Sequence, residues 1–108
     1  MDERQKMKTF KQKVYEIAAT IPKGKVMTYS QLAALAGNPK AARAVGMLMA
    51  KNPDLRKVPC HRVVSAKGEL TGYSNGGIKI KKEMLAVEGV LFNGDTVVLS
   101  KSKWKSSR

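Results

Sequence analysis

Residues 28–49 read TYSQLAALAGNPKAARAVGMLM, and this stretch decides the fold. Thr28 and Gln31 stand three residues apart, which is the spacing of a capping box, and they predict a short helix over Tyr29–Ala36. Gly37 follows, and glycine readily adopts the left-handed conformation in which many helices end. The stretch therefore begins with a short helix whose start and end are both marked.

The second half of the stretch predicts another helix. Asn38 is expected to cap it, and Pro39 is expected in its first turn, where no backbone N–H is needed. This helix should end near Asn52-Pro53. Two short helices joined by a tight turn predict a helix-turn-helix, a common DNA-binding motif.

The leading face of the second helix has an unusual composition. It carries the small residues Ala41, Ala42 and Gly46 and one long cation, Arg43. Helices that read the major groove usually project several long polar side chains. Small residues would let the helix lie against a narrow groove with Arg43 as a probe, or pack tightly on a neighbouring helix. The sequence leaves both interpretations open.

Further helices and short strands are predicted around this motif. Apolar residues at helical spacing predict a first helix over Thr9–Thr20 and a last one over Ile78–Val87. Between them, Arg62–Ser65 predicts a strand and Thr71–Gly77 a polar loop, while Val90–Leu99 predicts a hairpin with an Asn-Gly turn. The residues expected in the core are Phe10, Val14, Ile17, Ala18 and Ile21 in the first helix and Ile80, Met84, Leu85 and Val87 in the last.

Together these elements predict a mainly α fold with short β elements, a winged helix-turn-helix-like DNA-binding domain. The chain has 108 residues, which is room for one domain, expected over residues 1–108 with disordered ends at 1–6 and 106–108. Trp104 is the single tryptophan and is expected to pin the tail to the body of the domain.

Charge is the strongest bulk property of the chain. Lysine and arginine number 21 against 8 acidic residues, a net charge of +13. Solubility alone requires far less, so the excess predicts a polyanionic partner. Nucleic acid is favoured over an anionic membrane, because neither terminus predicts a basic helix with a bulky apolar face. No apolar run approaches the length of a membrane span, and residues 1–6 lack a signal-peptide pattern.

The only cysteine and the only histidine stand together in Pro59-Cys60-His61-Arg62. A lone buried cysteine is often an inert core residue. Cysteine is also a strong nucleophile, however, and histidine is the usual proton carrier near pH 7. One cysteine makes neither an internal disulfide nor a cysteine-based zinc site. We therefore expect a reduced thiol in an intracellular protein, and no metal.

Several motifs share their order and spacing with one protein family. Over about Phe10–Val90 the chain resembles the C-terminal, DNA-binding catalytic domain of the O6-alkylguanine-DNA alkyltransferases, also called methylated-DNA–protein-cysteine methyltransferases. The motifs are Gly37-Asn38-Pro39-Lys40-Ala41-Ala42-Arg43-Ala44-Val45-Gly46, Asn52-Pro53, Val58-Pro59-Cys60-His61-Arg62-Val63-Val64, Gly72-Tyr73-Ser74 with Gly76-Gly77, and Leu85-Ala86-Val87-Glu88-Gly89.

The resemblance implies a chemistry. Members of the family bind duplex DNA through the minor groove and rotate the damaged nucleotide into a pocket. They then transfer the alkyl group irreversibly from guanine O6 to a cysteine, once per molecule and without a cofactor. The matching motifs imply Cys60 as nucleophile, His61 as the base that takes its proton through a water, and Glu88 as the carboxylate that holds His61.

The same resemblance implies contacts with substrate and DNA. Tyr29 matches the tyrosine that donates to guanine N3 and crowds the phosphate during rotation of the nucleotide, and Arg43 matches the arginine that fills the vacated space in the base stack. Asn52 matches the asparagine that ties the helix-turn-helix to the active-site loop, and Arg62 is expected to make structural hydrogen bonds. In the implied substrate pocket, the backbone carbonyls of Cys60 and Val63 accept from the guanine amine, and N–H groups near Tyr73 and Ser74 face O6. The side chains of this pocket are those of Tyr29, Asn52, Val63, Tyr73, Ser74 and Lys81. The residues implied in DNA binding are Ser30, Pro39, Ala41, Ala42, Arg43 and Gly46.

Departures from the family leave alternatives open. The usual N-terminal domain is expected to be absent, the loop from Tyr73 to Gly77 is one residue longer than the common form, and Leu55 stands where some members have proline. Short length and the tail Lys101–Lys105 resemble the alkyltransferase-like proteins, which typically lack the cysteine and hand alkylated guanine to excision-repair proteins without repairing it.

We expect a monomeric suicide alkyltransferase that acts on O6-alkylguanine in double-stranded DNA, in the cytoplasm or a eukaryotic nucleus. A lesion sensor that recruits excision repair is the alternative. A general helix-turn-helix binder with an incidental cysteine is a weaker third, because it leaves Cys60-His61 unexplained.

Overall fold

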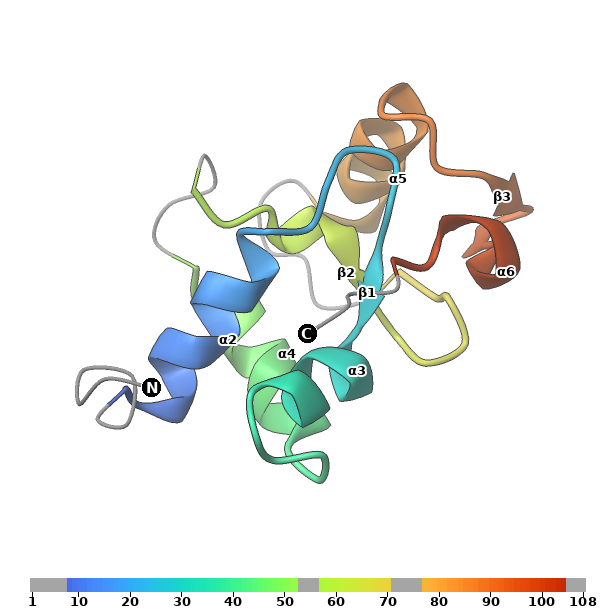
Figure 1. Cartoon of the computed structure of the whole chain (residues 1–108). Coiled ribbons are helices and arrows are strands. Elements are labelled where there is room, and N and C mark those ends of the chain that lie inside the picture. The colour runs from blue at the N-terminus through green and yellow to red at the C-terminus, as the bar shows by residue number, and fades with distance from the viewer. Residues whose placement is uncertain (1–7, 53–56, 71–76, 105–108) are drawn as a thin grey trace.

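The computed structural model describes residues 8–52, 57–70 and 77–104 (Figure 1). The predicted ends at 1–6 and 106–108, the loop residues Tyr73 and Ser74, and Leu55 lie outside these ranges. Within them, the predicted mainly helical fold with short strands is confirmed. The helices are α2 (Phe10–Ala18), α3 (Tyr29–Leu35), α4 (Ala42–Ala50), α5 (Gly77–Val87), α6 (Leu99–Ser102) and the 3-10 helix η1 (Cys60–Arg62); the strands are β1 (Met27–Thr28), β2 (Val63–Val64), β3 (Phe92–Asn93) and β4 (Thr96–Val97).

No helix in the described ranges is long and apolar enough to cross a membrane, and α5, the longest of them, has 11 residues.

Helices α2 and α3 begin with the same local device. The Thr28 hydroxyl accepts from the backbone N–H of Gln31 at 3.1 Å, and the Gln31 side chain accepts from the N–H of Thr28 at 3.4 Å. Thr9 and Gln12 close an equivalent box at the start of α2. Gly37 ends the α3 turn with a φ of +100°, as predicted. These local signals are sufficient to place α3.

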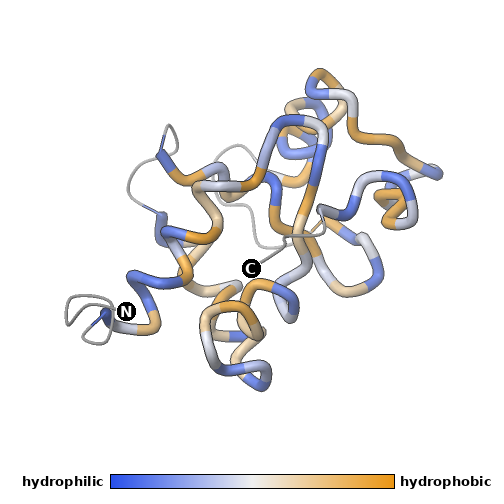
Figure 2. The backbone as a smooth tube through the Cα atoms, in the orientation of Figure 1, coloured by the Kyte–Doolittle hydropathy of each residue, from blue (hydrophilic) through white to orange (hydrophobic). Residues whose placement is uncertain are grey.

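The start of α4 differs from the prediction. Asn38 does not cap it, and Pro39 does not lie in its first turn, because the helix begins only at Ala42. The Asn38 carbonyl instead accepts from the N–H of Ala41 at 3.0 Å, and its side chain accepts from the N–H of Lys40 at 3.3 Å. Asparagine followed by proline favours this type of turn, with proline second among its four residues. Figure 2 shows the hydrophilic turn between α3 and α4.

A two-stranded parallel pair divides the interior into two hydrophobic clusters. Met27 of β1 pairs with Val63 of β2, and Thr28 pairs with Val64. Because side chains alternate along a strand, Met27 and Val63 face one cluster, and Val26 and Val64 face the other. The first cluster joins α2, α3, α4 and the Cys60 segment, and the second joins α5 and the hairpin.

Helix α5 is rotated relative to the prediction. Lys81 and Leu85 are its buried residues, whereas Ile80 is 39% and Val87 88% exposed. The expectation that Ile80 and Val87 face the core is therefore wrong. Lys81 can take the inner position because its ammonium donates to the Val63 carbonyl at 2.7 Å.

The predicted hairpin is present and packs on α5. Asn93 pairs with Thr96, so the corner residues are Gly94 and Asp95, one position later than the expected Asn-Gly turn. Gly94 has a φ of +65°, whereas Asn93 keeps the negative φ of a strand. Trp104 is partly buried against the first cluster, which confirms the predicted anchoring of the tail.

Candidate active site

The single cysteine lies at the start of a short tight helix against the core. The backbone N–H of Cys60 donates to the Val58 carbonyl at 2.8 Å, and the N–H of Arg62 donates to the Pro59 carbonyl at 2.9 Å. These bonds fold the segment into η1, which runs directly into β2. Cys60 is 2% exposed and belongs to the first hydrophobic cluster. The sheet that fixes β2 therefore also fixes the position of the thiol.

His61, Arg62 and Glu88 form a hydrogen-bonded cluster beside the cysteine. The Nε2 atom of His61 lies 3.0 Å from Oε2 of Glu88. Arg62 donates from Nε to Oε1 of Glu88 at 2.9 Å and from Nη2 to Oε2 at 2.6 Å, and its Nη1 donates to the Ile21 carbonyl at 2.7 Å. The structural hydrogen bonds predicted for Arg62 are confirmed. Arg62 thus forms a bidentate pair with the carboxylate and ties it to Ile21, in the segment that follows α2.

The electrostatics of this cluster favour a neutral imidazole beside a charged carboxylate. Burial lowers the pKa of His61, although its hydrogen bond and charge interaction with Glu88 act in the opposite direction. Burial alone would raise the pKa of Glu88, but hydrogen bonds from Arg62 and His61 outweigh it and lower that pKa. A neutral imidazole that donates from Nε2 to a carboxylate keeps its lone pair on Nδ1. His61 is therefore set up as a proton acceptor at Nδ1.

Glu88 reaches the cluster because α5 ends just before it. Its backbone N–H donates to the Met84 carbonyl at 3.2 Å, so the residue closes the last turn of the helix. The turn that follows Ile21 approaches closely, since a Cβ atom on Gly24 would lie 3.1 Å from the Glu88 carbonyl. Gly24 has a φ of +85°, which suits glycine at this crossing.

A buried cation completes the surroundings of the thiol. Lys81 is 1% exposed, and its Nζ lies 5.8 Å from the centroid of the Tyr29 ring as well as bonding the Val63 carbonyl. Burial lowers the pKa of Lys81 to about 8, and an electrostatic interaction with Cys60 opposes this shift. Three of the predicted pocket residues, Tyr29, Val63 and Lys81, are thereby brought together.

Asn52 links the helix-turn-helix to the cysteine segment. It is 9% exposed, and its Nδ2 donates to the Val58 carbonyl at 2.7 Å, two residues before Cys60. Its own N–H donates to the Met49 carbonyl at 3.3 Å, at the end of α4. The predicted tie is therefore present in the structure.

The predicted DNA-binding residues lie on the outer side of the helix-turn-helix. Arg43 and Pro39 are exposed, and Ala41, Ala42 and Gly46 are half-buried. A Cβ on Gly46 would lie 4.0 Å from Cε1 of Tyr29, so the small residue faces the tyrosine ring. Ser30, in the first turn of α3, is exposed as well. The face thus shows both properties that the sequence suggested: Gly46 packs closely on Tyr29, and the cationic side chain of Arg43 is exposed to solvent.

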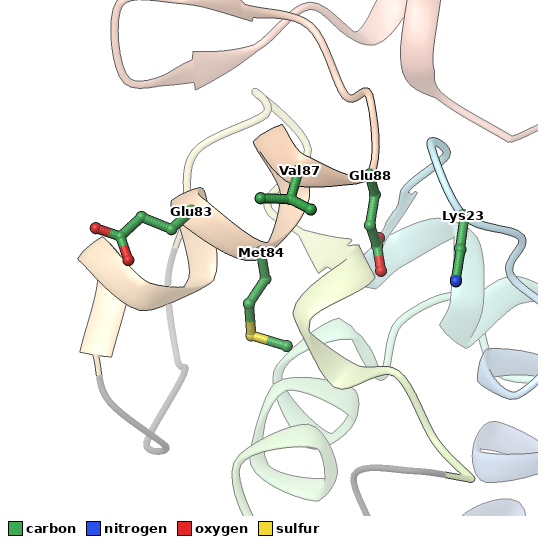
Figure 3. A pocket seen from close by; sticks show the side chains of 5 residues that line it. All are labelled: Lys23, Glu83, Met84, Val87 and Glu88. Carbon is green, nitrogen blue, oxygen red and sulfur yellow. The ribbon is translucent and has the colours of Figure 1, made fainter.

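A hollow of about 430 Å³ opens beside Glu88 (Figure 3). The figure shows Met84 and Glu88 reaching from α5 and its C-terminal end toward η1, with Lys23 on the facing turn. The lining residues are Lys23, Glu83, Met84, Val87 and Glu88.

Sequence reasoning missed two participants in this region. Tyr15 of α2 donates its hydroxyl to the Leu48 carbonyl at 2.8 Å; burial raises its pKa, and the charge of Cys60 raises it further. Lys23 lines the hollow together with Glu88. Both positions depend on tertiary packing, and no local motif marks them.

Comparison with known proteins agrees with this geometry. Residues 9–90 match the family described as "6-O-methylguanine DNA methyltransferase, DNA binding domain". The methylated-DNA–protein-cysteine methyltransferase of Homo sapiens is 49% identical over 79 residues, 73% of this chain and 38% of the relative. That of Methanosarcina acetivorans is 46% identical over 80 residues, 74% of this chain and 51% of the relative. The chain thus spans about two fifths to one half of the length of these relatives.

Two solved structures resemble the fold. OGT of Mycobacterium tuberculosis in complex with DNA superposes with a TM-score of 0.69 at 46% identity, over 75% of this chain and 49% of that one. Atl1 of S. pombe, in complex with damaged DNA that contains O6-carboxymethylguanine, gives a TM-score of 0.75 at 32% identity, over 98% of this chain and 100% of that one. With a matching family model over most of its length and a matching fold, the chain belongs to the 6-O-methylguanine DNA methyltransferase family.

Proposed function

We propose that the protein repairs DNA by moving the alkyl group of O6-alkylguanine onto Sγ of Cys60. The observation that carries the proposal is the cluster beside this thiol, in which Glu88 holds Nε2 of His61 at 3.0 Å and Arg62 holds Glu88. An unperturbed thiol is only a few per cent thiolate at neutral pH, so attack on an alkyl carbon benefits from a base of this kind.

The reaction balances without a cofactor. His61 takes the thiol proton through a water, and the Cys60 sulfur attacks the alkyl carbon. An S–C bond forms as the bond from that carbon to guanine O6 breaks, and the proton ends on the guanine. The products are unmodified guanine and a thioether on Cys60, which has no route back to the thiol, so each molecule acts once.

Lys81 and Tyr29 supply charge and hydrogen bonds around this step. The Lys81 ammonium lies among these groups and interacts electrostatically with Cys60. Tyr29 would donate to guanine N3. The Val63 carbonyl already accepts from Lys81 at 2.7 Å, so it would receive the guanine amine with its second lone pair.

The lesion reaches the site by rotation out of the duplex. Cys60 is 2% exposed, so an intact helix cannot present its base to the sulfur. The half-buried face of Ala41, Ala42 and Gly46 would lie in the minor groove, and the exposed Arg43 would fill the space left by the rotated nucleotide. We propose that the protein acts as a monomer.

Lesion sensing without repair is the second candidate. It is favoured by the match to Atl1, which extends over 98% of this chain and the whole of that one. Under this function the same pocket would hold alkylated guanine without transfer, and recruitment of excision-repair proteins would follow. Repair is favoured by the presence of Cys60 next to the hydrogen-bonded cluster of His61, Arg62 and Glu88.

Mass spectrometry of the intact protein separates the two functions. After incubation with a duplex that contains O6-methylguanine, transfer predicts that the chain gains the mass of one CH₂, since a methyl replaces the thiol hydrogen. Cys60→Ala should gain nothing. Tight, lesion-specific binding with unchanged mass would reject transfer and establish the sensor. Equal affinity for damaged and undamaged duplex, together with an unchanged mass, would reject both.

A further inference from the structure

The C-terminal segment Leu99–Trp104 lies beyond residues 9–90, which the family model matches, yet it is built into the fold. The N–H of Val26 donates to the Ser102 carbonyl at 2.9 Å, and the N–H of Trp104 donates to the Val26 carbonyl at 2.8 Å. Lys103 forms a parallel bridge with Val26. We call residues 99–104 the C-terminal clamp.

The clamp lies on the opposite edge of β1 from the active-site strand. β1 pairs with β2, which follows Cys60–Arg62 directly, and the clamp bonds the residue that precedes β1. Thr28 is both the last residue of β1 and the N-cap of α3. The direction in which α3 leaves the sheet is therefore set from two sides, by the cysteine segment and by the clamp.

Gln31 joins the clamp to the first turn of α3. One end of its amide closes the capping box by accepting from the N–H of Thr28. The other end, Nε2, donates to the carbonyl of Trp104 at 2.6 Å. Tyr29, the residue implied in nucleotide rotation, lies in the same helical turn. A single side chain thus connects the chain's tail to the helix start that carries this tyrosine.

The interior of the clamp is buried while its cations point outward. Ser102 is 2% exposed, and its hydroxyl accepts from the N–H of Leu91 at 3.2 Å. Trp104 packs against the first hydrophobic cluster, whereas Lys101 and Lys103 are exposed. Lys103 thus faces solvent between two inward-facing residues, Ser102 at the end of α6 and Trp104, and this makes the clamp part of the domain.

We propose that the clamp, through the bond from Gln31 to Trp104, holds Tyr29 in the position required for nucleotide rotation. Gln31 and Trp104 are then positioning residues for the reaction. This inference rests on the proposed function. Its physical basis is preorganisation, because a tyrosine whose helical turn is fixed on two sides loses little freedom when the nucleotide arrives.

Replacement of Gln31 tests the bond separately from the cap. Gln31→Glu retains a capping-box acceptor, since glutamate serves at this position, but removes the donor to Trp104. Gln12→Glu is the matched control, because Gln12 closes the box of α2 with the same geometry and the charge change is identical. Gln31→Met, which is neutral, removes both bonds of the side chain and controls for the added charge.

Each protein is assayed on O6-methylguanine in saturating duplex and as the free base. The duplex substrate requires rotation, and the free base does not. Gln31→Glu and Gln31→Met should slow the duplex reaction by about fivefold or more, with less than a twofold change on the free base. Gln12→Glu should change neither. Equal losses on both substrates, or a loss with Gln31→Glu alone, would overturn the clamp's role.

The fluorescence of Trp104, the single tryptophan, reports docking of the clamp without any reaction. Gln31→Glu should shift its emission to the red and increase quenching by acrylamide, and Gln12→Glu should not. An unchanged emission would contradict the inference. If wild-type protein bound the lesion but transferred no methyl, the proposed function would fail. The clamp would then be judged by emission and by lesion affinity, which the Gln31 variants should weaken.

Discussion

At the scale of single residues, the central feature is a base held by a carboxylate that is itself held by an arginine. Glu88 accepts from His61 and from two nitrogens of Arg62, and it lies at the end of α5, far along the chain from both. A motif can bring cysteine and histidine together, but only the fold can supply the carboxylate. The arrangement leads to two residue-level predictions.

The first concerns the pH dependence of alkyl transfer. Because burial lowers the pKa of His61 below its ordinary 6.5, the imidazole stays neutral at pH 7 and becomes protonated only at lower pH. The rate should therefore fall with a midpoint below 6.5 as the solution is acidified. Glu88→Gln removes interactions that raise this pKa, so the midpoint should move further down and the plateau rate should decrease.

Mass spectrometry of samples quenched at set times, over a series of pH values, measures both the midpoint and the plateau rate. Glu83→Gln is the control, because Glu83 lines the same hollow and carries the same charge but takes no part in the cluster. A midpoint above 6.5 in the wild type, or an upward shift in Glu88→Gln, would contradict the assignment of His61 as a neutral base.

The second residue-level prediction concerns stability. The side chains of Arg62 and Glu88 are 13% and 14% exposed, so removal of the carboxylate leaves a nearly buried guanidinium without its partner. Glu88→Ala should lower the free energy of unfolding by about 3 kcal/mol. Glu83→Ala, on the exposed side of α5, should change it by less than about 0.5 kcal/mol. Urea denaturation measures both values. If Glu88→Ala lost no more unfolding free energy than Glu83→Ala, the ion pair between Arg62 and Glu88 would not stabilise the fold.

At the scale of elements, the helix-turn-helix combines local capping with an open face. The capping box and Gly37 place α3, whereas α4 begins after a turn at Asn38–Ala41. Arg43 projects from the first turn of α4 and is exposed. Its proposed role as a probe applies only to a duplex.

Arg43→Ala should therefore separate duplex from free-base chemistry. Transfer from O6-methylguanine in duplex should slow by about tenfold or more, which corresponds to roughly 1.4 kcal/mol. Reaction with the free base should change by less than about twofold. Lys11→Ala removes an exposed cation from α2 and serves as the control. Equal losses on both substrates would reject the probe.

Two glycines of this motif should respond to alanine with opposite signs. Gly37 has a φ of +100°, and a Cβ there would meet nothing within 4 Å, so Gly37→Ala should cost about 1–2 kcal/mol from backbone conformation alone. Gly46 lies inside α4, and its Cβ would make an ordinary contact with Tyr29, so Gly46→Ala should stabilise by about 0.5–1 kcal/mol. Thermal unfolding measures both, and effects of the same sign would contradict the described turn.

The elements also show which features the sequence can predict. The capping residues Thr28 and Gln31, the left-handed Gly37 and the hairpin are local signals, and each prediction agrees with the structure to within a residue or two. The rotation of α5 is not predictable in this way, because a lysine on a helix normally faces solvent. Lys81 faces inward only because the Val63 carbonyl and the Tyr29 ring lie there.

In the candidate site, too, local motifs are predictable from the sequence and long-range contacts are not. The Cys60-His61 pair and the ties made by Asn52 and Arg62 can be expected from motifs. The contacts of Tyr15 and Lys23 depend on how α2 and its following turn pack against the cysteine segment and α5. Long-range contacts of this kind have no sequence period from which to predict them.

At the scale of the whole molecule, a net charge of +13 on 108 residues should dominate DNA binding. Each phosphate contact releases condensed counterions, so the logarithm of the binding constant should fall with the logarithm of salt concentration at about −0.9 per contact. We predict a slope of roughly −4 or steeper, equivalent to four or five phosphates. Fluorescence anisotropy with a labelled duplex measures it, and a flat response would show that the basic surface serves another partner.

The most direct test of the whole account is the stoichiometry of the adduct on Cys60. Protein is incubated with an excess of duplex that contains O6-methylguanine, and the modified fraction is followed by mass spectrometry and peptide mapping. We predict that every active chain acquires one methyl, on the peptide that contains Cys60, and that the count then stays at one. A chain that binds the lesion but keeps an unmodified Cys60 would contradict the account.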